Sequence, residues 1–445
     1  MITEFRHAHL DNKVLKLNNN LRLSFLREMS LISDVNDIPV EKVNKELVIK
    51  IEPKFGLGQT KYIYPYTLMS DNTICLPFAY ATRVLKVPRP ARKSFPSSRV
   101  KFQGTLRPEQ KIVRKEAVQC LNRRGSVIVS AYCGFGKTCM AVHMAAGIGF
   151  RTLIIVNKII LMKQWEESIL RFCPQAIAHR VTAKSPKKPG DFYIMNAQNV
   201  EKKGKKFFRD VGLVIVDEAH MIMAETLSKS LQYVYPRYLI GLTATPYRPD
   251  GLDILLQLYF GRHKIIRKLS RKHVVYKVDT GFIPKVERTF QGRVNWGSIL
   301  DQQANSVHRN EIIINIIEKY AKRNFLVLVK RVSQGEYLIK RLEEKGISVT
   351  NLIGSNQEFE SNARVLIGTC QKIGTGFDHP KLNTLILGAD IQEYFIQYLG
   401  RIFRIKDSEP MVFDLVDSNG ILRKHYATRA KVYREHGGTI YPWRQ

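Results

Sequence analysis

Short, fully apolar runs alternate with amphipathic segments along most of the chain. From residue 106 onward the apolar runs are SVIVS, TLIIV, FYIM, LVIVD and YLIGLTAT, separated by segments such as EQKIVRKEAVQCLN and ILMKQWEESILRF. A continuous apolar run indicates a strand buried on both faces, and alternation with helices indicates a parallel sheet. The pattern therefore predicts an α/β domain over residues 105–262, with helices on both faces of its sheet.

A second series of the same kind follows, with the apolar runs FLVLV, ISVTNLI, ARVLIGT, NTLILG and MVFDLV. We expect a second α/β domain over residues 306–445, similar to the first in architecture and not in sequence. Residues 262–293 carry ten basic and two acidic side chains. We therefore expect residues 263–305 to form a basic connection between the two domains.

Residues 1–104 show a different pattern. Apolar and polar residues alternate in short runs such as ELVIKIEP and TICLPFAY, broken by Pro and Gly, which predicts a small, basic α+β or mostly β domain. The stretch from Arg83 to Lys101 holds seven basic residues, three prolines and no acidic residue. We expect this stretch to be a linker or an edge that faces nucleic acid.

Charge narrows the classes of function. The 445 residues include 71 Lys and Arg against 39 Asp and Glu, a net charge of +32. A polyanion partner explains this imbalance, because each neutralised phosphate releases counterions. A basic surface that serves only solubility is the alternative. An anionic membrane is disfavoured, since the sequence has no basic amphipathic helix and no lipidation motif.

Other compositional features exclude further classes. The 44% apolar content excludes a disordered or collagen-like chain. No run approaches the ~18 apolar residues of a membrane span, and the N-terminal MITEFRHAHLDNK lacks the apolar core of a secretory signal. The six cysteines are scattered without a C-x-x-C pair, which disfavours zinc sites and disulfides. We therefore expect a cytoplasmic or nuclear protein.

A glycine-rich loop follows the first strand of the first domain. SVIVS runs into AYCGFGKT (131–138) and then into the helical CMAVHMAAG, which is the context of a phosphate-binding loop. Its glycines would let backbone N–H groups face a phosphate at a helix N-terminus, its lysine would neutralise the β- and γ-phosphates, and its threonine hydroxyl would bind Mg²⁺. The predicted ATP-binding residues are Ala131, Tyr132, Cys133, Gly134, Phe135, Gly136, Lys137 and Thr138.

Two acidic residues end a later buried strand. LVIVDEAH (213–220) places Asp217 and Glu218 at the strand's carboxyl end. Asp217 would hold Mg²⁺, and Glu218 would polarise the attacking water. Capping of the next helix is the alternative for an isolated acidic pair, and the preceding phosphate loop disfavours it. His220 is a catalytic candidate because it completes the four-residue string DEAH.

These motifs together resemble the superfamily 2 helicases and translocases. The phosphate loop, DEAH (217–220) and TATP (243–246) are followed by IGTGFDHP (373–380) and QYLGRIFR (397–404), which are similar to motifs V and VI of that family. LRPEQ (106–110) is similar to its adenine-reading element, and NKIILMKQW (157–165) to its motif Ia. The resemblance covers residues 105 to about 420, and the family commonly has Ala where this chain has Ala131.

The resemblance implies two tandem RecA-like domains with ATP between them. Arg401 and Arg404 would act as arginine fingers that stabilise charge on the γ-phosphate, with Gln397 in the same motif. Thr243 and Thr245 are expected to link the ATP site to the nucleic-acid groove.

Further nucleotide and nucleic-acid contacts follow from the same resemblance. Gln110 would hydrogen-bond the adenine edge, Arg107 would stack on it, and Gly376 and Asp378 would lie near the ribose or the interdomain seam. Trp165 is favoured as a core residue, since Leu161 and Ile169 lie four residues on either side. The candidate nucleic-acid contacts are polar or basic and carry no sequence preference: Asn157, Lys158, Gln164, Asn196, Gln198, Lys330, Arg331 and Thr369.

Three sequence segments indicate a particular group within the family. CGFGKT, NKIILMKQW and GLTATPYRPDG are similar to the group that contains phage recombination helicases, the helicase of transcription factor H and the poxvirus transcript-release helicase. The last of these, a DNA-dependent ATPase of large cytoplasmic DNA viruses, is the nearest in character. If the chain is viral, it would work in a replication factory or a virion.

The expected function is therefore an ATP-dependent DNA helicase or translocase with ATP and Mg²⁺ as cofactors. RNA is the alternative nucleic acid, and RNA polymerase or other transcription and replication proteins are candidate partners of a monomer. Two rival functions stay open: a duplex translocase that remodels complexes without separating strands, and an inactive, ATP-gated binding module. The full set of motif residues argues against inactivity, and the second domain argues against a small-molecule kinase.

Overall fold

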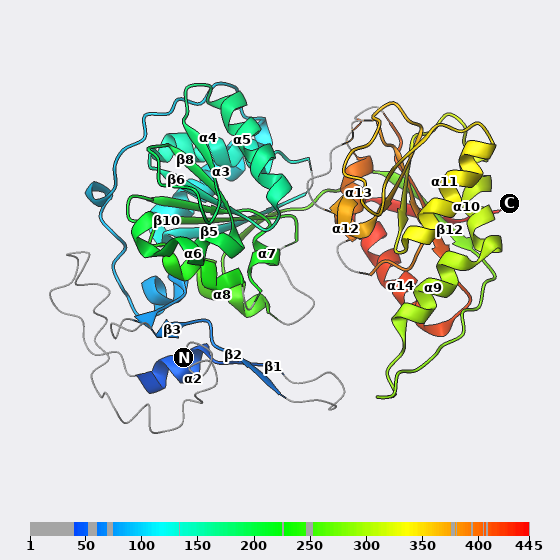
Figure 1. Cartoon of the computed structure of the whole chain (residues 1–445), viewed down its shortest axis with the longest axis horizontal. Coiled ribbons are helices and arrows are strands. Elements are labelled where there is room, and N and C mark those ends of the chain that lie inside the picture. Colours follow the sequence, from blue (N-terminus) through cyan, green and yellow to red (C-terminus); the bar gives the residue numbers. More distant parts are fainter. Residues whose placement is uncertain are drawn as a thin grey trace. The chain divides into compact units, whose positions relative to one another are not determined.

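The computed structural model describes residues 40–51, 60–68, 74–132, 134–224, 227–245, 252–374, 379, 381–392, 395–403, 405 and 408–444. It divides into two compact units, one made mainly of residues up to 266 and the other mainly of residues from 267 onward. Each unit is built on one large sheet (Figure 1).

The first unit contains a seven-stranded sheet with the strand order β11-β5-β10-β9-β6-β8-β7. The pairs from β5 through β7 are parallel. The strands are β5 (Ser126–Ala131), β6 (Thr152–Val156), β7 (Ala178–Val181), β8 (Phe192–Asn196), β9 (Leu213–Val216), β10 (Tyr238–Thr243) and β11 (Lys264–Arg267).

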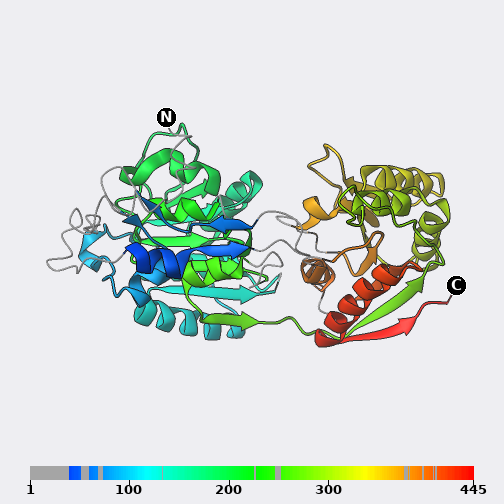
Figure 2. The same ribbon diagram turned by 90° about the horizontal axis from the view of Figure 1, so that it is seen from below.

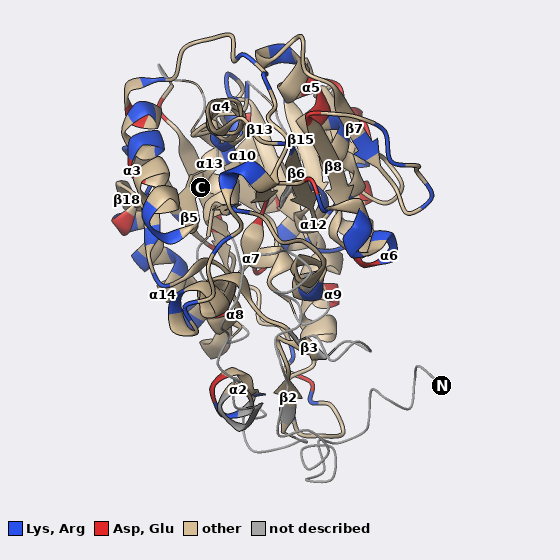
Figure 3. Ribbon diagram, turned by 90° about the vertical axis from the view of Figure 1, so that its left-hand side faces the viewer, with Lys and Arg blue, Asp and Glu red and all other residues tan. Residues whose placement is uncertain are grey.

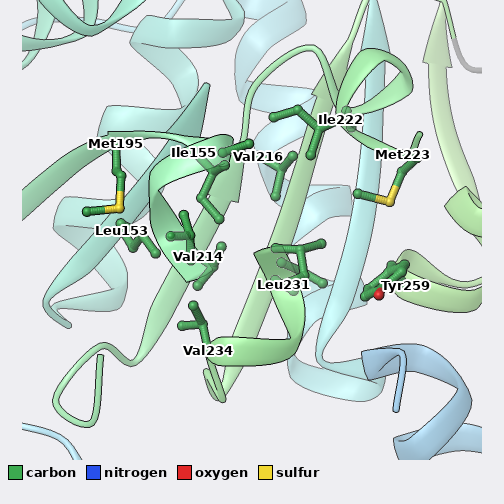
Figure 4. Close-up of a cluster of buried hydrophobic side chains, with 14 of the residues drawn as sticks. Leu153, Ile155, Met195, Val214, Val216, Ile222, Met223, Leu231, Val234 and Tyr259 are labelled. Carbon is green, nitrogen blue, oxygen red and sulfur yellow. The ribbon is translucent and has the colours of Figure 1, made fainter. Parts of the chain in front are cut away.

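Helices lie on both faces of this sheet (Figures 1 and 2). They are α3 (Pro108–Arg124), α4 (Lys137–Ile148), α5 (Ile159–Phe172), α6 (Ala197–Phe207), α7 (Ala219–Ile222) and α8 (Asp253–Phe260). On one face Leu153 and Ile155 of β6 pack with Val214 and Val216 of β9, because alternate strand residues project to the same side (Figure 4). This packing fixes the strand ends from which the functional loops leave.

The second unit repeats the architecture with the strand order β14-β15-β13-β16-β17-β12-β18, and all six neighbouring pairs are parallel. Its strands are β12 (His273–Asp279), β13 (Phe325–Val329), β14 (Val349–Leu352), β15 (Val365–Thr369), β16 (Thr384–Leu387), β17 (Met411–Val416) and β18 (Gly438–Pro442). Its helices are α9 (Trp296–Asn305), α10 (Val307–Lys319), α11 (Val332–Glu344), α12 (Cys370–Gly374), α13 (Phe395–Ile402) and α14 (Gly420–Glu435).

Strand β13 shows why its sequence is continuously apolar. Phe325, Val327 and Val329 enter one buried cluster, while Leu326 and Leu328 enter another. Both faces of the strand are therefore covered, as expected for a parallel sheet between helices.

The predicted fold class is confirmed: two tandem α/β units with parallel sheets follow a small α+β segment. In that segment, α2 (Val40–Leu47) precedes two antiparallel strand pairs. The pairs are β1 (Ile49–Ile51) with β2 (Lys61–Ile63), and β3 (Thr67–Leu68) with β4 (Ile74–Cys75).

Residues 263–305, expected as a basic connection, carry more regular structure than that expectation allows. Strand β11 neighbours β5 in the first sheet, β12 lies between β17 and β18 in the second, and α9 follows. The sequence of β12, HVVYKVD, mixes apolar and polar positions, and only some of its residues are buried. It therefore lacks the continuous apolar run that marked the other strands.

The basic stretch from residue 83 to residue 101, here called the strap, contacts the first unit through its arginines. Arg83, Arg89 and Arg92 donate to backbone carbonyls at the C-terminal ends of α8, α3 and α4, respectively. These carbonyls form the negative ends of helix dipoles, so guanidinium groups are favourable there. A Cβ on Gly125, which ends α3 with φ +80°, would lie 2.4 Å from Arg89 Cδ. These three arginines therefore contact protein, and a role of the stretch as a linker or as an edge that faces nucleic acid stays a prediction.

Candidate functional site

The predicted phosphate loop lies at the carboxyl end of β5. Ala131 ends that strand and Lys137 begins α4, with Gly134 and Gly136 in left-handed conformations at φ +85° and +80°. Lys137 Nζ donates to the Ala131 carbonyl oxygen at 2.8 Å, so the lysine folds back across the loop. Thr138 is the second residue of α4. The loop therefore presents a cation and a hydroxyl at a helix N-terminus.

The first turn of α3 is tied to this loop by Gln110. The Arg107 backbone N–H donates to Gln110 Oε1 at 2.8 Å, and Gln110 Nε2 donates to the Gly136 carbonyl oxygen at 3.4 Å. A Cβ on Gly136 would lie 2.4 Å from Gln110 Nε2, so a glycine is needed for this close approach. The roles of Gln110 and Arg107 toward adenine stay predictions.

The acidic pair follows β9 and is fixed from two sides. Trp165 Nε1, on α5, donates to Asp217 Oδ2 at 2.8 Å, and the Glu218 backbone N–H donates to Asp217 Oδ1 at 3.0 Å. Glu218 has φ +46°, a left-handed conformation that costs a non-glycine residue about 1–3 kcal/mol and that clusters at functional sites. Its Oε2 is buried and accepts no hydrogen bond from any residue that the structure describes.

The two carboxylates of the acidic pair repel each other, and Asp217 is also poorly hydrated. Burial and the charge of Glu218 together raise the pKa of Asp217 to about 6, against the opposing effects of the Trp165 hydrogen bond and the Lys137 charge. Two adjacent carboxylates with reduced hydration are a favourable place for a divalent cation. The residues therefore fit a magnesium nucleotide: the loop would take its phosphates, and Thr138 and Asp217 would hold its metal.

His220 lies between the acidic pair and the end of β10, to which it is joined by hydrogen bonds. His220 Nδ1 lies 3.4 Å from Glu218 Oε2 and 2.7 Å from Thr243 Oγ1. The Thr243 hydroxyl in turn donates to the Thr245 carbonyl oxygen at 2.8 Å. Sequence reasoning grouped Thr243 and Thr245 as coupling residues, and the structure brings them to His220.

The remaining candidates of the first unit lie at neighbouring strand ends. Asn157 and Lys158 follow β6, where the charge of Glu218 partly offsets the loss of hydration that lowers the pKa of Lys158. Gln164 lies on α5. Asn196 caps α6 by accepting from the Gln198 backbone N–H at 3.0 Å. Lys158 therefore lies in the electrostatic environment of the acidic pair, and Asn196 has a local capping role.

The candidates of the second unit lie on helix α13 and at the ends of strands β13 and β15. Gln397 and Arg401 are buried on α13. Lys330 and Arg331 follow β13, and Arg331 Nε donates to Asp301 Oδ1 at 2.6 Å. Thr369 ends β15.

Four predicted site residues lie outside the described part of the chain: Cys133, Gly376, Asp378 and Arg404. Sequence reasoning did not foresee the contact of Trp165 with Asp217. Its spacing from Leu161 and Ile169 indicated a buried side chain, and the structure confirms a relative exposure of 2%. No sequence signal shows where its N–H group points.

Comparisons with known proteins agree on one family. The family described as type III restriction enzyme, res subunit, matches residues 103–248. "Putative helicase 161L" of Invertebrate iridescent virus 6 is 42% identical over 92% of this chain and 98% of its own length. "Putative helicase 055L" of Frog virus 3 is 33% identical over 84% of this chain and 88% of its own length.

A solved structure supports the fold. That of S. cerevisiae Dbp5 bound to RNA and ADP BeF3 covers 76% of this chain and 94% of its own, with a TM-score of 0.54 and 13% identity. Among the described residues, no helix is both long enough and apolar enough to span a membrane.

Proposed function

Because the chain belongs to the helicase family that these viral proteins represent, we propose that it hydrolyses ATP in order to move along DNA. The observation that carries this proposal is the convergence of the phosphate loop and the acidic pair at one sheet edge. The loop leaves β5 and the pair leaves β9, and both strands flank β10. Lys137 and Glu218 therefore lie at the carboxyl end of the sheet, which is where nucleotides bind in parallel α/β sheets.

Each residue has a role in this proposal. Lys137 neutralises the β- and γ-phosphates, Thr138 and Asp217 hold Mg²⁺, and Glu218 orients the attacking water. The metal supplies charge that stabilises the transferring phosphate. In the second unit, Arg401 and Arg404 are proposed to stabilise the same developing charge.

The charge supports a nucleic acid as the partner, and the resemblance to DEAH-type DNA motors favours DNA. The net charge of +32 suits a polyanion. Figure 3 shows Lys and Arg along α3 and α6 of the first unit. We further propose a role like that of the poxvirus transcript-release helicase, in which the motor acts on a transcribing polymerase of a large DNA virus.

The test compares ATP hydrolysis with single-stranded DNA, duplex DNA and RNA side by side, followed by strand displacement on tailed duplexes. We expect DNA to stimulate hydrolysis more than RNA, and the Lys137→Ala variant to bind DNA without turning over ATP. Stimulation by duplex DNA without strand displacement would favour the duplex translocase. Stimulation by RNA alone would contradict the choice of DNA, and hydrolysis by the Lys137→Ala variant would contradict the assignment of the loop.

A further inference from the structure

Between β12 and α9 the chain forms an arm, residues 281–295, that leaves the sheet of the second unit (Figure 1). Arg288 and Val294 form an antiparallel bridge. The Thr289 N–H donates to the Arg293 carbonyl oxygen at 2.7 Å, and the Gly292 N–H donates back to the Thr289 carbonyl oxygen at 2.8 Å. The arm is therefore a hairpin with a tight turn over residues 289–292.

The hairpin is braced at its base and along its length. Gln302 of α9 accepts from the Lys285 backbone N–H at 2.8 Å and donates to the Lys285 carbonyl oxygen at 2.9 Å. At the base, the Ser418 N–H donates to the Phe282 carbonyl oxygen at 2.7 Å. A braced hairpin holds its tip in one place without the entropy loss that a free loop would suffer on binding.

The tip presents an aromatic ring to solvent. Phe290 has a relative exposure of 108%, the highest of the large apolar residues in the described part of the chain, and Ile283 on the same arm is 69% exposed. A fully exposed aromatic ring at the tip of a braced hairpin is available to stack on a partner.

The charge of the arm favours an anionic partner. Lys285, Arg288 and Arg293 lie on the arm with Glu287 as its single acidic residue. A base has a π-face that stacks on an aromatic ring, and the phosphates beside it pair with guanidinium groups. An apolar protein surface would satisfy the ring but not the three cations.

We propose that this arm is a base-stacking element: Phe290 stacks on an unpaired nucleic-acid base, and Arg288 and Arg293 contact the neighbouring phosphates. The inference deepens the proposed function, on which it depends. It assigns a base contact to a motor whose other candidate contacts are to the backbone.

The test measures binding of a labelled single-stranded oligonucleotide by fluorescence anisotropy, in parallel with the same oligonucleotide made of abasic sites. Phe290→Ala should weaken binding roughly 5- to 150-fold, as expected for the loss of one stacked base. Phe290→Leu should behave like Phe290→Ala because it keeps apolar area without a ring, whereas Phe290→Trp should retain binding. On abasic strands the wild type and all three variants should bind alike.

Val307→Ala provides the matched control, since Val307 is an exposed apolar residue of the same unit outside the arm, and its binding should be unchanged. Equal binding by wild type and Phe290→Ala, or an equal loss on abasic strands, would overturn the proposal. A dimer that Phe290→Ala converts to a monomer would assign the arm to a second copy of the chain instead. A wild-type protein that binds no nucleic acid would overturn the proposed function as well.

Discussion

The imidazole of His220 is joined to the hydroxyl of Thr243, with Nδ1 and Oγ1 2.7 Å apart. The Thr243 hydroxyl has one proton, which it donates to the Thr245 carbonyl oxygen at 2.8 Å. It must therefore accept from His220, which fixes the tautomer of a neutral imidazole with its proton on Nδ1. This bond connects His220, two residues after the acidic pair, with the end of the adjacent strand β10.

Replacing Thr243 by Val should separate hydrolysis from movement. The substitution keeps the shape and leaves the buried His220 N–H without its acceptor, a loss of about 1–3 kcal/mol in the free energy of unfolding. We expect strand displacement to fall more than ATP hydrolysis, measured on the same tailed duplex. Thr245→Val is the comparison: it keeps the Thr245 carbonyl oxygen through which this coupling residue meets Thr243, and Thr245 Oγ1 has no hydrogen bond to any described residue, so this variant should lose little. A parallel loss of both activities in Thr243→Val would contradict a coupling role.

Glu218→Gln should bind nucleotide normally and hydrolyse it slowly. Asp217, which is assigned to the metal, keeps its hydrogen bonds from Trp165 and from the residue 218 backbone. The amide cannot polarise water as a carboxylate does. Nucleotide affinity measured by fluorescence titration, set beside single-turnover hydrolysis, distinguishes the two effects. Loss of affinity with unchanged turnover would show that Glu218 binds nucleotide instead.

Activity should decline as the pH falls through about 6, because Asp217 must be ionised to hold a cation and its pKa is raised to about 6. The Trp165 hydrogen bond opposes this rise, so Trp165→Phe, which keeps most of the ring packing, should move the acidic limb of the ATPase profile to higher pH. More Mg²⁺ should move it back, since the cation favours the carboxylate. An acidic limb that neither Trp165→Phe nor Mg²⁺ moves would mean that another group titrates.

The raised pKa of Asp217 makes folding stability depend on pH in the opposite direction to activity. A carboxyl whose pKa is raised in the folded state binds its proton more tightly there than in the unfolded chain. The stability that Asp217 contributes is therefore greatest below its ordinary pKa of 3.8 and is lost as the pH rises to about 6. Denaturant unfolding of Asp217→Asn should lack this part of the pH dependence between pH 4 and 6.

Arg89→Ala should destabilise the first unit by about 1–2 kcal/mol, because two carbonyls at the end of α3 lose their donor. Lys93→Ala is the matched control: Lys93 is exposed on the same strap, and its loss should be neutral. Urea unfolding monitors stability, and the salt dependence of DNA binding monitors charge. If Arg89→Ala instead leaves stability unchanged and flattens the salt dependence, the strap binds DNA.

The sequence by itself determined most of the framework. Continuous apolar runs predicted strands such as β9 and β13, because a strand buried on both faces has no room for polar side chains. The phosphate loop and the acidic pair were also readable, since their residue types are contiguous and each follows a strand. Parallel strands then require Lys137 and Asp217 to lie at one edge of the sheet.

Only the tertiary structure decided the contacts between residues distant in sequence. Strand β12 enters the second sheet through hydrogen bonds to β17 and β18, although its own pattern is mixed. The Trp165 N–H reaches Asp217 across 52 positions, and Arg83 reaches the Phe260 carbonyl oxygen across 177. The sequence shows only that such side chains are apolar or charged. Their partners depend on how helices pack against the sheet, which no local pattern encodes.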